Sequence, residues 1–188
     1  MKISYQRAHT QALAWRHIAA LRPRPPQASN RLLQTQQSLT KLCQHNCQQG
    51  FRVEPILQQW TKPGVEESRL LGHPPGQLAY VRHVLLRCEN ASWLFARTVI
   101  PHASLSGPCR QMLHLGSRSL GVFLFSFKFR KCQPSQAVQI SPKQLQELSG
   151  LQSPKPVWGR RNVYIIKGRK LLITEVFLRP EALPATHF

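Results

Sequence analysis

The stretch Leu171-Leu172-Ile173-Thr174-Glu175-Val176-Phe177-Leu178 decides the fold predicted for this chain. Side chains alternate between the two faces of a strand, and here both faces are apolar, so the stretch is expected to be a strand buried on both sides. Its single charge, Glu175, is then buried as well. Because an unpaired buried carboxylate is costly or becomes protonated, Glu175 must have a partner, and it is a candidate site residue.

The residues around this strand predict further antiparallel pairs. Asn162–Ile166 is a second strand pattern, and Lys167–Lys170 is a short turn with a glycine, so the two strands form a predicted hairpin. Ala79–Cys88 and Ser92–Ile100 predict another hairpin upstream, and Phe51–Trp60 predicts one more strand. On the first strand of that upstream hairpin, alternation places a second charge, an arginine, on an apolar face.

Helical patterns are fewer. Ser38 is a good N-cap for a helix over Leu39–Cys47, and Lys143–Leu148 is a second helical pattern. Phe125–Phe129 alternates aromatic and polar residues, which predicts a half-exposed strand, and Thr61–Gln77 reads as a long loop. This order of elements predicts an α+β fold in which a single antiparallel β-sheet is flanked by helices.

The length of 188 residues fits one domain of ordinary size. Residues 1–30 carry five Lys or Arg, no acid and a short helical pattern broken by prolines. Such a start fits either an organelle transit peptide or a helix and linker docked on the domain. We expect residues 1–30 to be an N-terminal helix and linker segment with freedom to move, and residues 31–188 to form the domain.

The charge balance is extreme, with 26 Lys and Arg against 7 acidic residues and a net charge of +19. It favours an anionic partner, either nucleic acid, a membrane surface or a small anionic substrate, or else it reflects scattered charges that only solvate the surface. All seven acids are glutamates, and only Glu175 lies in an apolar strand. Chemistry that needs two carboxylates is therefore not expected.

The five cysteines are odd in number and follow no secretory signal, so we expect reduced thiols in a cytoplasmic protein. Cys43, His45 and Cys47 suggest a zinc site, but no second Cys or His pair follows at finger spacing, and we expect no metal. No apolar run is long enough for a transmembrane segment.

Six stretches, in this order along the chain, resemble the chorismate lyase (chorismate pyruvate-lyase) family. They are SLTK (38–41), VRHVLL (81–86), FARTVIP (95–101), LGSRSLG (115–121), WGRR (158–161) and LLITEVFL (171–178). The resemblance runs from about Ser38 to Pro180 and is loosest between Ser126 and Lys155. Each stretch is weak alone, but the ordered set is specific.

The resemblance implies a sheet flanked by helices, with a small site sealed beneath helical flaps. It also implies that residues 31–188 are a catalytic domain that converts chorismate to 4-hydroxybenzoate and pyruvate, the first step of ubiquinone biosynthesis, without a cofactor or metal. By resemblance, the side chains of Arg82 and Glu175 are catalytic and hold the aromatic product. The backbone amides of Leu39 and Leu120 complete the binding set.

Three positions depart from the family pattern. His83 follows Arg82 where an acidic residue is common, but strand alternation turns it away from the site. The turn after Cys88 lacks the usual glycine, so Asn90 is expected to take a positive φ. Leu39 stands where a methionine is expected, and a backbone contact tolerates this change.

Two other functional classes stay open. A ligand-sensing domain of a transcription regulator can share this fold, although residues 1–37 are too short to supply a DNA-binding module. A basic nucleic-acid-binding protein would account better for the net charge of +19. We expect chorismate as the small-molecule partner, no nucleic-acid partner, and a monomer.

Overall fold

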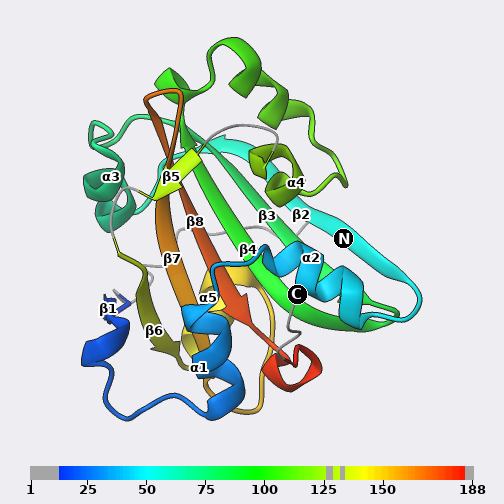
Figure 1. The fold of residues 1–188 in the computed structure, drawn as a ribbon. Coiled ribbons are helices and arrows are strands. Elements are labelled where there is room, and N and C mark those ends of the chain that lie inside the picture. Colours follow the sequence, from blue (N-terminus) through cyan, green and yellow to red (C-terminus); the bar gives the residue numbers. More distant parts are fainter. Residues whose placement is uncertain (1–12, 126–128, 132–133, 185–188) are drawn as a thin grey trace.

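The computed structural model describes residues 13–125, 129–131 and 134–184. Within these residues the chain forms an eight-stranded antiparallel sheet in the order β1-β6-β7-β8-β4-β3-β2, with β5 paired to β7 beside this path (Figure 1). The strands are β1 (Arg16–His17), β2 (Phe51–Thr61), β3 (Ala79–Cys88), β4 (Ala91–Pro101), β5 (Phe129–Lys131), β6 (Gln136–Ile140), β7 (Val157–Ile166) and β8 (Arg169–Phe177). The α+β fold with a helix-flanked antiparallel sheet is therefore confirmed.

Helices cover both faces of this sheet. The α-helices are α1 (Gln27–Gln34), α2 (Leu39–Asn46), α3 (Val65–Leu71), α4 (Leu120–Phe125) and α5 (Pro142–Ser149), and the 3-10 helices are η1 (Ile18–Ala20), η2 (His102–Ser104), η3 (Gly107–His114) and η4 (Pro180–Ala182). Figure 1 shows α1 and α2 in front of the sheet and α5 behind it. No helix in the described part of the chain is long and apolar enough to cross a membrane.

The predicted hairpins β7–β8 and β3–β4 are present. Strand β8 is hydrogen-bonded to β7 along one edge and to β4 along the other, so it lies in the interior of the sheet. Both of its faces can therefore be covered, in keeping with its two apolar rows of side chains. The β7–β8 turn has Lys167 and Gly168 at φ values of 47° and 76°. In the β3–β4 turn the positive φ of 52° falls on Glu89, so the expectation for Asn90 was wrong.

The two faces of the sheet differ, and we call the one that bears Arg82 the front face and the one that bears His83 the back face. On the front face α1 and α2 pack over one apolar cluster, and η3 and α4 pack over a second. On the back face α5 and α3 cover two further clusters. Arg82 and Glu175 lie between the two front clusters, because each is flanked along its own strand by one apolar residue of either cluster. Arg160 lies opposite Glu175 in the sheet, so three charged residues share the gap between the two apolar patches.

Some elements differ from the sequence-based expectations. The helical pattern before Pro23 is instead β1 and η1, while α1, which was not predicted, begins at Gln27 and runs across residue 30. Buried Leu21 joins the same cluster as α1. Since this stretch is short and broken by prolines, its packing against the domain decides its conformation rather than its helix propensity.

Two more helices replace a predicted loop and part of a predicted strand. Helix α3 lies inside the expected loop, where the Gly64 N–H donates to Glu67 and Gly72 in the left-handed region ends the helix. Phe125, the first residue of the strand predicted over Phe125–Phe129, is instead the last residue of α4, in which Leu120 and Leu124, four residues apart, both pack on the front face. Phe129, at the other end of that prediction, does begin a strand, β5. The expectation for Phe127 lies outside the described residues.

Cys47 and Cys88 form a disulfide, so the expectation of reduced thiols was wrong for this pair. They are 41 residues apart in sequence, and only the pairing of β2 with β3 brings the end of α2 to the end of β3. With Cys47 bonded, the proposed zinc ligands Cys43, His45 and Cys47 are not jointly available. Among the described residues no group of three or more His, Cys or acidic residues could hold a metal.

His83 belongs to a buried charge network on the back face. Arg97 donates to both carboxylate oxygens of Glu67 at 2.7 Å and to His83 Nε2 at 2.7 Å. Burial, together with the neighbouring Arg97, lowers the pKa of His83 to about 3 although Glu67 acts in the opposite direction. The imidazole is therefore neutral in the folded protein at ordinary pH.

The neutral His83 makes stability depend on pH. The unfolded chain protonates this histidine near pH 6.5, whereas the folded protein does so only near pH 3, so its stabilising contribution is present above about pH 6.5 and is lost as the pH falls towards 3. Between pH 7 and pH 5 the loss is expected to be roughly 2 kcal/mol. Urea denaturation of the wild type and of His83→Gln, which keeps an acceptor for Arg97, measures it. Equal pH slopes for the two proteins would contradict the assignment.

Candidate active site

A cavity of about 230 Å³ lies on the front face between the two apolar clusters. It is smaller than common small-molecule pockets of about 300–1,000 Å³, so it suits a compact ligand. All four residues predicted from the resemblance line it: Arg82 from β3, Glu175 from β8, Leu39 from α2 and Leu120 from α4. The fold thus brings together residues that are up to 136 positions apart in the chain.

Arg82 is a buried cation without an acidic partner in the described structure. Only 2 % of the residue is exposed, and no ion pair among the described residues includes it. One terminal nitrogen, Nη2, donates to the carbonyls of Gly116 (2.9 Å) and Arg118 (3.0 Å), while Nε is buried without a hydrogen-bond partner there. Burial lowers the pKa of the Arg82 guanidinium, yet an arginine stays charged. The site therefore presents an oriented positive charge with unused donor capacity.

Glu175 has the partner that its burial requires. Strand pairing sets Arg160 of β7 opposite Glu175 of β8, and Arg160 Nε donates to Glu175 Oε2 at 2.6 Å. The side chains are 4 % and 15 % exposed, respectively. The sequence-based argument called for a partner but did not identify Arg160. Two lone pairs on each carboxylate oxygen leave Glu175 able to accept further hydrogen bonds.

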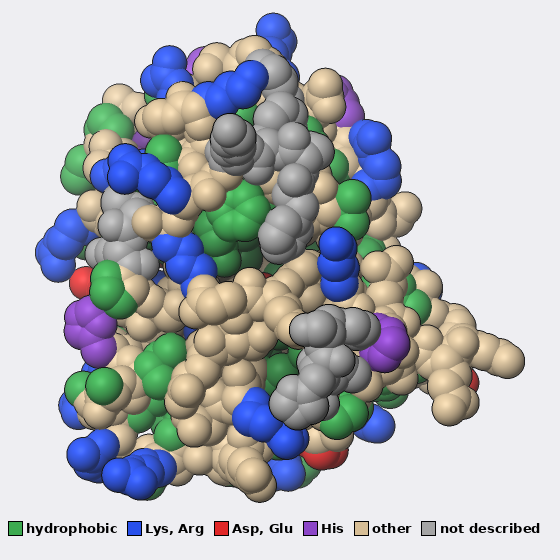
Figure 2. All heavy atoms as spheres, viewed as in Figure 1, with side chains coloured by type: hydrophobic (Ala, Val, Ile, Leu, Met, Phe, Trp, Pro, Cys, Tyr) green, Lys and Arg blue, Asp and Glu red, His purple; other side chains and the backbone are tan. Residues whose placement is uncertain are grey.

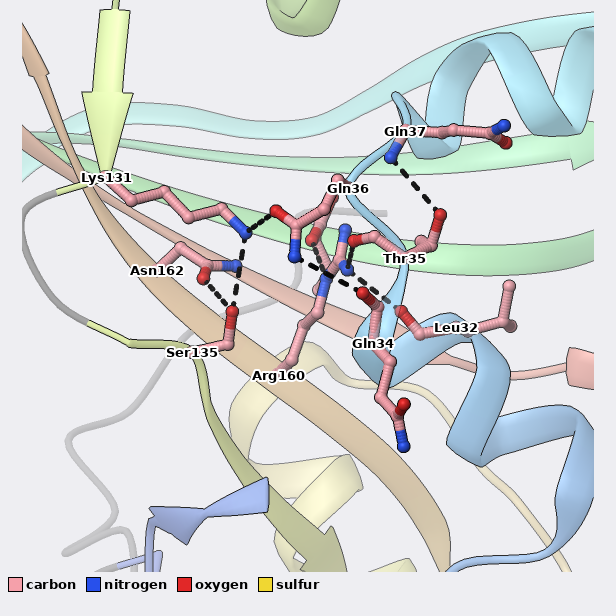
Figure 3. Close-up of polar contacts among 10 residues, drawn as sticks. Leu32, Gln34, Thr35, Gln36, Gln37, Lys131, Ser135, Arg160 and Asn162 are labelled. Atoms are coloured by element: carbon pink, nitrogen blue, oxygen red, sulfur yellow. Dashed lines mark hydrogen bonds and ion pairs between the residues drawn. The ribbon is translucent and has the colours of Figure 1, made fainter. Parts of the chain in front are cut away.

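Arg160 also holds the chain that leads into α2. Its Nη1 donates to the carbonyls of Leu32 (2.9 Å) and Thr35 (2.7 Å), as Figure 3 shows. These carbonyls lie in the last turn of α1 and just after it, where a helix leaves its carbonyls without internal partners. Arg160 thus links the acid of the cavity to the segment that covers it.

Helices α2 and α4, the cover helices, start side by side at the cavity. Ser38 caps α2 by accepting from the Lys41 N–H, and Ser119 Oγ donates to Thr40 Oγ1 at 3.0 Å across the two helix starts. A Cβ on Gly121 would lie 3.2 Å from Ser38 Oγ, so the close approach depends on this glycine. The first N–H groups of a helix have no intrahelical acceptor, which makes the amides of Leu39 and Leu120 candidate ligand donors.

Sequence reasoning missed several polar residues of the cavity, among them Lys131, Arg160 and Tyr164. Arg160 could have been found, because counting back from the two-residue turn of the β7–β8 hairpin pairs it with Glu175. Tyr164 lies farther along the same strand, and its burial, helped by the charge of Glu175, raises its pKa. No sequence signal identified Lys131, which lies in the part of the chain where the resemblance is loosest.

The charges that line the cavity are mostly positive. Arg82, Arg130, Lys131 and Arg160 face a single acid, Glu175, so the lining carries a net charge of +3. Figure 2 shows other Lys and Arg side chains spread over this side of the molecule rather than gathered into one patch. The cavity therefore gathers several positive charges around a single acid, and it suits a small anion.

Solved structures share this fold. A GntR-family transcriptional regulator from Bacillus cereus matches with a TM-score of 0.55 over 74 % of this chain and 99 % of its own, at 15 % identity. The PhnF C-terminal domain matches with a TM-score of 0.54 over 68 % of this chain and 82 % of its own, at 16 % identity. At these identities the likeness describes the fold alone.

Sequence comparison is more specific. A protein named "Probable chorismate pyruvate-lyase" from Halorhodospira halophila is 35 % identical over 92 % of this chain and 93 % of its own length. A protein of the same name from Methylococcus capsulatus is 36 % identical over 75 % of this chain and 88 % of its own. The sequence profile of the chorismate lyase family matches residues 9–184. The chain therefore belongs to the chorismate lyase family.

Proposed function

We propose that this protein is a chorismate pyruvate-lyase, a carbon–oxygen lyase that converts chorismate to 4-hydroxybenzoate and pyruvate. The observation that carries the proposal is Arg82, a buried guanidinium with no acid partner in the described structure, in a cavity of about 230 Å³. A buried cation needs a counter-charge, and a ligand carboxylate supplies one in bidentate geometry. Family membership names a substrate that carries such carboxylates.

The other site residues fit the remaining features of this substrate. We assign Glu175 as the acceptor for the 4-hydroxyl group, with Arg160 keeping its carboxylate in place. The backbone amides of Leu39 and Leu120 are assigned as donors to ligand oxygen. Arg82 and Glu175 would then hold opposite ends of one six-membered ring.

The reaction requires the protein mainly to orient the substrate. The C3–O bond of the enolpyruvyl ether and the C4–H bond break, the hydrogen passes to the enolpyruvyl methylene, and the ring becomes aromatic as pyruvate leaves. A cyclic transfer of this kind needs a fixed substrate conformation and stabilisation of charge. Glu175 as a general base is the alternative, and a Glu175→Gln variant that retains most of the turnover would exclude it.

Three further proposals concern the location, the oligomeric state and the domain bounds of the protein. We propose a cytoplasmic monomer whose catalytic domain spans residues 31–188, with residues 13–30 packed against it. The competing classes are a ligand-sensing domain of this fold and a basic nucleic-acid-binding protein. Conversion of chorismate separates both of them from an enzyme.

The test is direct. Purified full-length protein is mixed with chorismate in the presence of EDTA, and 4-hydroxybenzoate and pyruvate are quantified separately, with boiled protein as the control for spontaneous decay. The expected result is equal amounts of both products, with inhibition by added 4-hydroxybenzoate because a site beneath the two cover helices releases product only after they move. Rates equal to the boiled control would overturn the proposal.

A further inference from the structure

Lys131 is a second cation of the cavity that has no acidic partner among the described residues. It is the last residue of β5 and pairs with Tyr164 of β7. Its Nζ donates to Gln36 Oε1 at 2.8 Å and to Ser135 Oγ at 3.5 Å (Figure 3). An ammonium has three N–H donors, so one is left for a ligand.

The surroundings of Lys131 favour an anion. Burial lowers its pKa, and the charge of Arg160 lowers it further, while Glu175 acts in the opposite direction. The one acid of the cavity, Glu175, is already bound to Arg160 at 2.6 Å. A negative ligand group next to Lys131 would therefore remove a repulsion that the protein itself does not neutralise.

Lys131 also lies where the cavity meets the outside. Lys131 and Gln36 line both the cavity and an outer groove of about 800 Å³. His17, Arg22 and Arg24 line this groove, so it is basic as well. An anion that enters along the groove meets Lys131 before it reaches the interior.

The geometry of the substrate decides which group meets Lys131. Chorismate carries one carboxylate on ring carbon C1 and one on the enolpyruvyl ether at C3, next to the hydroxyl-bearing C4. With the hydroxyl at Glu175 and the ring carboxylate at Arg82, the enolpyruvyl group lies on the Glu175 side of the ring. Lys131 is on that side, since β5 pairs with β7, the strand that carries the partner of Glu175, whereas Arg82 lies on β3, which β4 separates from β8. Lys131 and Arg160 also donate to neighbouring residues of one segment, Gln36 and Thr35.

We infer that Lys131 binds the enolpyruvyl carboxylate of chorismate, the carboxylate that leaves with pyruvate, and so distinguishes substrate from product. The inference rests on the proposed function. Arg82 would bind a carboxylate that both chorismate and 4-hydroxybenzoate possess, whereas Lys131 would bind one that only chorismate possesses. Loss of Lys131 must then weaken substrate binding and leave product binding unchanged.

The experiment compares Lys131→Met with the wild type and with Lys62→Met, which removes the same charge from an exposed position away from the cavity. Steady-state kinetics give KM and kcat for chorismate, and calorimetry gives the Kd of 4-hydroxybenzoate. For Lys131→Met we expect KM to rise on the order of 10- to 100-fold, kcat to change little, because the contact is made equally in the ground and transition states, and the Kd of 4-hydroxybenzoate to stay within about twofold. Lys131→Arg should restore part of the affinity.

The outcomes separate the alternatives. Equal weakening of chorismate and 4-hydroxybenzoate by Lys131→Met would mean that Lys131 only shapes the cavity, and an unchanged KM would mean that it is not a ligand group, so either result overturns the inference. A KM rise of the same size in Lys62→Met would reduce the effect to long-range attraction and overturn it too. If Lys131→Met fails to fold, Lys131→Gln replaces it under the same criteria. A wild type that forms no product refutes the proposed function, whereas an active wild type with unaffected variants refutes this inference alone.

Discussion

Replacing Arg82 by methionine is expected to lower kcat/KM for chorismate by at least about 100-fold, since a charge-assisted bidentate contact with a buried guanidinium is lost. Arg82→Lys should recover little, because an ammonium lacks the planar fork. The Kd of 4-hydroxybenzoate should rise in both variants, since the product keeps the ring carboxylate. Steady-state kinetics and calorimetry provide these values.

The stability of the Arg82 variants distinguishes a site residue from a structural one. Because Arg82 has no acid partner in the described structure, its replacement leaves no buried carboxylate unpaired. The hydrogen bonds to the Gly116 and Arg118 carbonyls are lost, but the cost of burying an uncompensated charge disappears with them, so the two effects on stability offset each other. Arg87→Met, on the same strand but paired with Glu54, is the matched control and should keep full activity. Near wild-type turnover in folded Arg82→Met would show that the proposed site is wrong.

Replacing Arg160 by methionine is expected to lower the free energy of unfolding by roughly 3–5 kcal/mol, because it leaves Glu175 buried without its partner. The carbonyls of Leu32 and Thr35 lose their donor in the same step. Activity should fall as well, since the acid that holds the substrate hydroxyl is no longer fixed. Chemical denaturation followed by circular dichroism gives the stability, and the chorismate assay gives the activity.

A double-mutant cycle isolates the ion pair from these other losses. Glu175→Gln combined with Arg160→Met should be less destabilised than the sum of the two single variants, because the double variant contains no unpaired charge. Additive effects would mean that the 2.6 Å contact contributes nothing to stability. The control pair is Glu66 and Arg69, which is exposed and should show a coupling below about 1 kcal/mol.

The sheet could be predicted from sequence because its signals are local. Period-two patterns and short turns identify β7–β8 and β3–β4, and a double-sided apolar strand such as β8 must be central. The short helices α1, α3 and α4 escaped prediction because their residues become helical through packing on the sheet. Tertiary contacts, rather than intrinsic propensity, select their conformation.

The site was predictable where the charge lies in an apolar strand. Arg82 and Glu175 stand out for that reason, and the structure places both at one cavity. The partner of Glu175 was not identified because alternation gives the face of a strand but not its neighbour in the sheet. Lys131 and the Cys47–Cys88 bond depend on contacts between distant segments, which spacing along the chain does not encode.

The disulfide gives the two ends of α2 unequal freedom. Cys47, at the end of the helix, is bonded to Cys88 of β3, whereas the start of the helix beside the cavity is held by the hydrogen bond between Thr40 and Ser119. Because the bond fixes the end of α2 at Cys47, movement of the helix should be widest at Ser38. The first-turn amides have no intrahelical acceptor and should exchange fast with deuterium with or without the bond. Reduction of the disulfide should therefore speed exchange in the last turn of α2 and leave the first turn unchanged.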